Sequence, residues 1–222
     1  SIVGSIVSGM STHLNLFGGS ILPDSGKIML DGKDITTLKE FKRSAKIGRV
    51  FQDPSVGTVP GLSILENLSV AANKGRPYGL KFAVPKKKND RLYSAVAELG
   101  LGLEDKMDIP VGLLSGGQRQ AIALLMATMT PISFLILDEH TAALDPKTAE
   151  IIMKLTDRIV REKSLTAIMV THNLRYAVEY GNRMLMLHHG DIVLERKAAA
   201  KTETTVDDIL SVFNEISIEC GN

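Results

Sequence analysis

A glycine-containing segment at the start of the chain places the strongest constraint on its fold. The sequence SIVGSIVSGMST has glycines at positions 4 and 9 and a serine at position 11. This spacing follows the phosphate-binding pattern G-x-x-x-x-G-K-[ST], except that Met10 replaces the lysine. Apolar residues before the loop, and Leu14 and Phe17 at helical spacing after it, predict a strand, a loop and a helix. Because SIVG is typical of the end of a strand, we expect residues upstream of Ser1 to be missing.

The composition suits one compact domain and excludes several classes of protein. The chain has 222 residues, of which 44% are hydrophobic. Its 26 basic and 25 acidic residues nearly balance, so no nucleic-acid partner is expected. No apolar run approaches the roughly 18 residues that a membrane helix needs, and the start lacks the basic region of a signal peptide. The single cysteine, Cys220, cannot form an internal disulfide, which suits the cytoplasm.

The second half of the chain alternates between strand and helix patterns. From residue 131 these are ISFLILDE, KTAEIIMKLTDRIVREK, LTAIMVTHN, LRYAVEYG, RMLMLHHG and DIVLE. Such alternation predicts a parallel sheet covered by helices on both faces. Residues 55–130 show helical periodicity around the basic run KFAVPKKKNDR, which we interpret as a solvated face rather than a contact with acidic lipid. We expect an α/β core, 1–54 and 131–222, interrupted by a helical subdomain at about 55–130.

Four shorter segments also carry predictions. GKIMLDGKDI alternates around an Asp-Gly turn and predicts a short hairpin, and IGRVFQDP predicts a strand that ends at Pro54. Near the end of the chain, ERKAAAK is typical of a linker, and TVDDILSVFNEISIE predicts a final amphipathic helix.

Two carboxylates follow the apolar run FLIL. Asp138 and Glu139 come at the carboxyl end of this predicted strand, where ligands bind in open parallel sheets. There Asp138 could hold Mg²⁺ and Glu139 could activate a water molecule. Taken alone, the same residues also fit a plain strand end with solvated acids.

A serine and two glycines begin a predicted helix in LLSGGQRQAIALLMAT. Ser115 suits the N-cap, and Gly116 and Gly117 leave backbone N–H groups exposed at the positive end of the helix dipole, where a phosphate could bind. The alternative is an ordinary capped helix after a loop.

Together, six motifs in one order resemble the nucleotide-binding subunit of ABC transporters, over nearly the whole chain. They are GSIVSGMST (P-loop), VFQDP (Q-loop), LLSGGQRQ (signature), FLILDE (Walker B), AALD (D-loop) and MVTHN (switch histidine). The resemblance implies a P-loop NTPase (RecA-like) parallel-sheet core with an inserted helical subdomain, and a small antiparallel sheet truncated at its N-terminal side. It also implies ATP and Mg²⁺ as cofactors.

The resemblance assigns a role to individual residues. Glu139 would be the general base, His172 would contact the γ-phosphate, and Gln52 would link the metal and the attacking water to the helical subdomain. Mg²⁺ would be held by Ser11, Gln52 and Asp138. The nucleotide would be bound by Gly4, Ser5, Gly9, Met10, Ser11 and Thr12, and across a head-to-tail dimer by Ser115, Gly116, Gly117 and Asp145. Taken singly, Gln52 also fits a surface residue, His172 a helix cap, and Asp145 a helix start.

The first motif departs from the family at two positions. Val7 stands where the family usually has a glycine, and Met10 offers neither charge nor donor to the β- and γ-phosphates. We expect ATP binding to weaken and hydrolysis to suffer more. The loop could be naturally degenerate, the sequence could be altered there, or hydrolysis could use another arrangement; we favour the first two.

The resulting functional prediction is an ATP-hydrolysing subunit of an ABC importer for a small solute such as an amino acid. It would form a homodimer, or pair with another ABC subunit, and would work with a separate transmembrane permease and a solute-binding protein. The expected location is cytoplasmic, peripheral on the inner face of the membrane. The alternative is a nucleotide-responsive regulatory subunit with little hydrolysis, because of Met10 and Val7.

Overall fold

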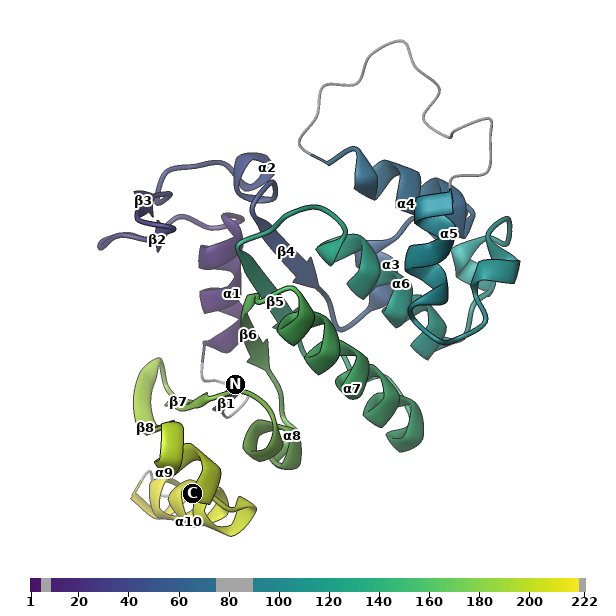
Figure 1. The fold of residues 1–222 in the computed structure, drawn as a ribbon. Coiled ribbons are helices and arrows are strands. Elements are labelled where there is room, and N and C mark those ends of the chain that lie inside the picture. The colour runs from purple at the N-terminus through teal and green to yellow at the C-terminus, as the bar shows by residue number, and fades with distance from the viewer. Residues whose placement is uncertain (5–8, 75–89, 220–222) are drawn as a thin grey trace. The chain divides into compact units, whose positions relative to one another are not determined.

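The computed structural model describes residues 1–4, 9–74 and 90–219 (Figure 1). The chain divides into two compact units. Unit 1 comprises Ser1–Leu14 and Ile168–Asn222, and unit 2 comprises Asn15–Ala167. The boundaries fall within helix α1 (Met10–Gly18) and strand β6 (Thr166–Val170).

In unit 1, strand β1 (Ile2–Gly4) is parallel to both of its neighbours, β6 and β7 (Arg183–His188). Ile2 pairs with Val170 on one side and with Leu185 on the other. Strand β8 (Asp191–Lys197) instead runs antiparallel to β7. The prediction of a parallel sheet is therefore wrong for the edge strand β8, and the sheet is mixed.

A tight turn between β7 and β8 explains this difference. His188 pairs with Asp191, so only two residues connect the strands. Both of them, His189 at φ 47° and Gly190 at φ 91°, have positive φ, as a type I′ hairpin turn requires. So short a connection permits only antiparallel neighbours, because a parallel pair needs a crossover of about a dozen residues or more.

Helices α8 (Leu174–Glu179) and α10 (Val206–Glu219) pack on the strands of unit 1. The buried centre of this cluster consists of Val3, Ala177, Met184, Met186 and Ile209. Helix α10 adds apolar side chains at helical spacing after Ile209, namely those of Val212, Phe213 and Ile216. The predicted amphipathic helix at the end of the chain is therefore confirmed.

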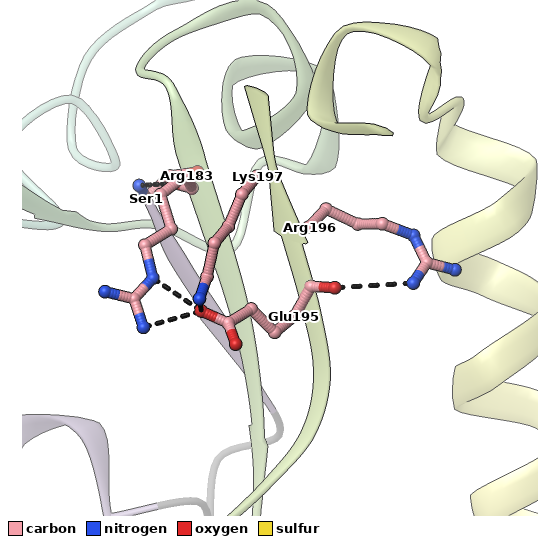
Figure 2. A network of polar contacts seen from close by, with 5 residues as sticks. All are labelled: Ser1, Arg183, Glu195, Arg196 and Lys197. Carbon is pink, nitrogen blue, oxygen red and sulfur yellow. Dashed lines mark hydrogen bonds and ion pairs between the residues drawn. The ribbon is translucent and has the colours of Figure 1, made fainter. Parts of the chain in front are cut away.

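The predicted linker ERKAAAK is wrong, because its residues are tied into unit 1. Lys197 ends β8, and helix α9 follows directly (Ala198–Glu203). Lys201 of α9 is buried, and its ammonium group donates to the Val178 carbonyl. On β8, Glu195 accepts a hydrogen bond from Arg183 at 2.6 Å and pairs with Lys197 at 3.0 Å (Figure 2). The contacts with Val178 and Arg183 reach 23 and 12 residues back along the chain, so local composition did not reveal them.

Unit 2 contains the parallel pair β4 (Ile47–Val50) and β5 (Phe134–Asp138). The three residues Leu135, Ile136 and Leu137 of β5 are each no more than 3% exposed. Since successive side chains of a strand point to opposite faces, both faces of β5 are covered. The predicted hairpin is confirmed as the antiparallel strands β2 (Met29–Leu30) and β3 (Lys33–Asp34).

The middle of unit 2 is helical, as the sequence predicts. Its elements are α3 (Pro54–Gly57), α4 (Ile64–Ala72), α5 (Asp90–Ala97), two 3-10 turns (Glu104–Lys106 and Val111–Leu113) and α6 (Gly116–Thr128). Helix α7 (Pro146–Glu162) follows β5. Helix α6 is buried on all sides along residues 121–125. Most of the basic run KFAVPKKKNDR lies outside the described residues. Within the described ranges, no helix has the length and apolarity to cross a membrane.

A buried arginine joins the end of α1 to the segment before β4. Arg43 ends helix α2 (Glu40–Arg43) and is 2% exposed. Its guanidinium donates four hydrogen bonds of 2.6–3.1 Å to the carbonyl oxygens of Leu16, Phe17, Thr36 and Leu38. The last carbonyls of a helix lack intrahelical partners, and Arg43 supplies donors to two of them at the end of α1.

Replacing this arginine should destabilise the protein strongly. Arg43→Met keeps much of the apolar stem but removes the donors of four partly buried carbonyls, so we expect the free energy of unfolding to fall by about 3 kcal/mol. Urea unfolding followed by circular dichroism measures this change. The control is Lys42→Met at the exposed neighbouring position, which should change stability little. Equal effects of the two substitutions would contradict this role.

Candidate functional site

In unit 1, the phosphate-loop residues flank the start of α1. Gly4 is the buried last residue of β1, and Gly9 has φ 77° immediately before the helix. Ser5 and Val7 lie outside the described residues. The Gly9 carbonyl accepts the backbone N–H of His13 at 3.1 Å and lies 2.9 Å from its Nδ1. The strand, loop and helix thus follow in the predicted order.

Met10 does not occupy the position of an exposed cation. Its side chain is 6% exposed and belongs to the apolar core, whereas Ser11 and Thr12 of the same helical turn are exposed. A thioether suits such a buried place, and a lysine there would have to extend its ammonium group back to water. The structure therefore explains why methionine is tolerated but provides no cation at this position.

In unit 2, Asp138 is the last residue of β5 and Glu139 follows it directly. Both residues are partly buried. Asp138 Oδ2 accepts a hydrogen bond from Arg49 of β4 at 2.7 Å, and the two side chains are 18% and 17% exposed. The other arm of Arg49 donates to Asn15 Oδ1 at 2.8 Å, and its Cζ lies 4.7 Å from the centre of the Phe51 ring. Arg49 therefore fixes one face of the Asp138 carboxylate.

Sequence reasoning did not identify Arg49. The available signal was a cation inside the otherwise apolar segment IGRVF, since a charged residue on a buried strand needs a partner.

Gln52 follows this strand and is exposed, just before the N-cap Asp53 of α3. In the part of the chain that the structure describes, no cluster of three or more His, Cys, Asp or Glu residues is arranged to hold a metal.

Glu139 has an unusual backbone conformation. Its φ is 47°, in the left-handed region that few residues other than glycine adopt. Its carbonyl accepts the N–H of Ala142 at 2.9 Å, which closes a turn directly after β5. The next residue, His140, is buried and lies with Nε2 at 3.1 Å from Thr156 Oγ1 of α7.

The signature residues form the capped start of α6. Ser115 accepts the N–H of Gln118 at 3.3 Å, and Gln118 Oε1 accepts the N–H of Ser115 at 3.2 Å. This reciprocal capping box fixes the first turn while Ser115 and Gly116 remain exposed. The exposed N–H groups lie at the positive end of a 13-residue helix.

Asp145 caps α7 beside the signature. Its carboxylate accepts the N–H of Thr148 at 3.1 Å, and this hydrogen bonding keeps the pKa of the Asp145 carboxyl below its usual value. An added Cβ at Gly117 would lie 2.2 Å from Thr148 Cγ2, and one at Gly116 would lie 3.2 Å from Leu144. The signature and the D-loop of one chain are therefore in direct contact, which the sequence did not predict.

His172 follows β6 in unit 1 and is exposed. The alternative of a helix-capping histidine is wrong, because the N-cap of α8 is the next residue. Asn173 accepts the N–H of Tyr176 at 3.3 Å. The cap of α8 is therefore supplied by Asn173 and not by His172.

The close approach at Gly117 gives a specific stability prediction. Gly117→Ala would place a methyl group against Thr148 Cγ2, so we expect a loss of about 1–3 kcal/mol in the free energy of unfolding. Thr148→Ser removes that methyl and should restore most of the loss in the double variant. Urea unfolding of the four proteins forms a double-mutant cycle. Strictly additive effects would contradict the contact.

Comparisons with known proteins identify the family. A model described as "ABC transporter" matches residues 1–142. A tyrosine transport ATP-binding protein of Clostridioides difficile (strain R20291) is 49% identical over 213 residues, which are 96% of this chain and 84% of that protein. A methionine import ATP-binding protein, MetN 2 of Bacillus cereus (strain ATCC 14579), is 33% identical over 96% of this chain, which spans 62% of that relative's length.

Solved structures agree with this result. A dimeric post-hydrolysis state of the ATP-binding cassette MJ0796 bound to ADP and Pi has a TM-score of 0.73 and 30% identity. The match covers 88% of this chain and 83% of that one. The chain described here therefore belongs to the ABC transporter family, as an ATP-binding ATPase domain with the α/β fold of P-loop NTPases.

Proposed function

We propose that this chain is the ATP-hydrolysing subunit that powers import of a small solute such as an amino acid. The observation that carries the proposal is the end of the buried strand β5, where Asp138 and Glu139 stand at the carboxyl edge. The tyrosine and methionine relatives, each matching 96% of the chain, support import and an amino-acid substrate. Within the chain, 1–54 and 131–222 would form the catalytic core and about 55–130 the helical subdomain.

The proposed roles follow the family motifs residue by residue. Gly4, Ser5, Gly9, Met10, Ser11 and Thr12 would hold the phosphates of ATP. Glu139 would act as general base toward the attacking water, with Gln52 beside it and His172 at the γ-phosphate. The exposure of Gln52 and His172 supports these roles, since their side chains are accessible to a ligand.

The proposed metal is Mg²⁺, held by Ser11, Gln52 and Asp138. Hydroxyl, amide and carboxylate oxygens are the hard ligands that Mg²⁺ prefers, so the donor set fits. When bound, the ion would neutralise charge on the phosphate oxygens of ATP. Arg49 donates a hydrogen bond to Asp138 Oδ2, so we assign Asp138 Oδ1 to the ion or to a water molecule bound to the ion.

The proposed assembly is a dimer that encloses ATP between two subunits. Ser115, Gly116 and Gly117 would bind the nucleotide held by the partner subunit, and Asp145 would couple the two sites. Gly117 contacts Thr148 in the helix that Asp145 caps. The signature residues and Asp145 would therefore approach the partner subunit together, which supports a shared role in binding the nucleotide. A transmembrane permease and a solute-binding protein would complete an importer, with this subunit on the cytoplasmic face of the membrane.

A second candidate is a nucleotide-responsive regulatory subunit with little hydrolysis. The specific observation in its favour is Met10, whose buried thioether supplies no cation. The names of the tyrosine and methionine relatives refer to transport and import, and they favour the first candidate.

Turnover decides between the two candidates. We expect the protein with its partner permease to hydrolyse ATP faster than its Glu139→Gln variant, at a rate limited by Met10. Losing a donor aimed at developing charge costs roughly 100- to 1,000-fold, so Met10→Lys should raise kcat substantially. Met10→Leu, which is also neutral, should not.

Phosphate release and equilibrium binding of labelled ATP with Mg²⁺ give separate readouts. Wild-type turnover equal to that of Glu139→Gln, with binding intact, would contradict the hydrolytic role and support the regulatory one. Undetectable binding would contradict both candidates.

Arg49 should influence metal binding. Arg49→Met removes a cation 2.7 Å from Asp138, so we expect Mn²⁺, in the presence of a non-hydrolysable ATP analogue, to bind up to about tenfold more tightly. Electron paramagnetic resonance of free Mn²⁺ measures this affinity. The matched control, Arg49→Lys, keeps the charge and should stay close to wild type. Unchanged Mn²⁺ affinity in Arg49→Met would argue against Asp138 as a metal ligand.

A further inference from the structure

The strained backbone of Glu139 requires something to hold it. A φ of 47° is strained for a glutamate, and such conformations persist only where the surroundings impose them. On one side the residue is fixed by β5, whose Leu137 is 3% exposed. On the other side, the Ala142 N–H donates to the Glu139 carbonyl and closes the turn. Ala142 is exposed, so this hydrogen bond lies at the surface.

The buried residue after Glu139 supplies a further restraint. His140 is 2% exposed and Thr156 is 3% exposed, so both polar groups need a partner. The Thr156 hydroxyl donates to the Ile152 carbonyl at 2.7 Å within α7, so toward His140 it acts as the acceptor. His140 Nε2 therefore carries a proton and donates to Thr156 at 3.1 Å.

The imidazole is neutral under ordinary conditions. Burial lowers the pKa of His140 to about 4, so it does not introduce a charge beside Glu139. A neutral ring with a defined tautomer makes one directed bond, which suits a structural tether better than an acid or base.

We propose that His140 is a positioning residue, which ties the turn carrying Glu139 to helix α7 through Thr156. The inference rests on the proposed function, in which Glu139 is the general base. The tether would hold the Glu139 backbone in its left-handed conformation and so aim its carboxylate. Thr156 lies 17 residues beyond Glu139 in the sequence and acts only through His140.

The test compares Thr156→Val, which removes the acceptor with little change of shape, with Thr156→Ser, which keeps it. We expect kcat for ATP hydrolysis to fall about 10- to 100-fold in Thr156→Val, while KM and equilibrium ATP binding stay within about threefold. Thr156→Ser should restore kcat to near the wild-type value. A purely structural role would lower stability without this division between kcat and KM.

A second readout does not depend on turnover. Hydrogen exchange of the Ala142 amide, which donates to Glu139, should become about tenfold faster or more in Thr156→Val and stay unchanged in Thr156→Ser. Unchanged exchange in Thr156→Val would overturn the tether. If exchange accelerates but the wild-type protein hydrolyses no ATP, the proposed function fails and the tether stands.

Should Thr156→Val fail to fold, His140→Phe removes the donor and keeps a buried ring. It should accelerate Ala142 exchange in the same way. Parallel losses of kcat and of ATP binding in either variant would overturn a positioning role, because they would indicate general damage to the site.

Discussion

The burial of β5 on both faces determines where chemistry can take place in unit 2. Leu135, Ile136 and Leu137 leave no place along the strand for a charged group, because an isolated buried charge would cost many kcal/mol. The carboxylates of Asp138 and Glu139 can therefore appear only where the strand ends. There the chain also has to turn, and the turn places Glu139 in a conformation that needs support from elsewhere.

Two arginines of unit 2 are buried or partly buried only because oxygen acceptors surround their guanidinium groups. Arg43 is buried because four carbonyl oxygens accept from it, and Arg49 is partly buried because Asp138 and Asn15 accept from its two arms. Each guanidinium joins segments far apart in the chain with a fixed, planar set of donors. A neutral or flexible side chain could fill the same volume without setting the same geometry.

The sequence predicted much of this architecture, for physical reasons. Strand and helix patterns depend on local periodicity, so β5, α7 and α10 were predictable, and the family assignment is confirmed by the comparisons. The pair Arg49 and Asp138, 89 residues apart, and the contact of Gly117 with Thr148 were not predictable, since periodicity carries no information on tertiary neighbours. The turn at His189 was missed because its left-handed conformation is rare outside glycine.

The neutral state of His140 also links folding to acidity. Its pKa is about 4 in the folded protein, against an ordinary value of 6.5, so between these values the unfolded chain binds the extra proton. The contribution of this residue to stability is thus complete above about pH 6.5 and declines as the pH falls toward 4. A side chain placed beside Glu139 to organise a turn therefore also makes the fold sensitive to mild acid.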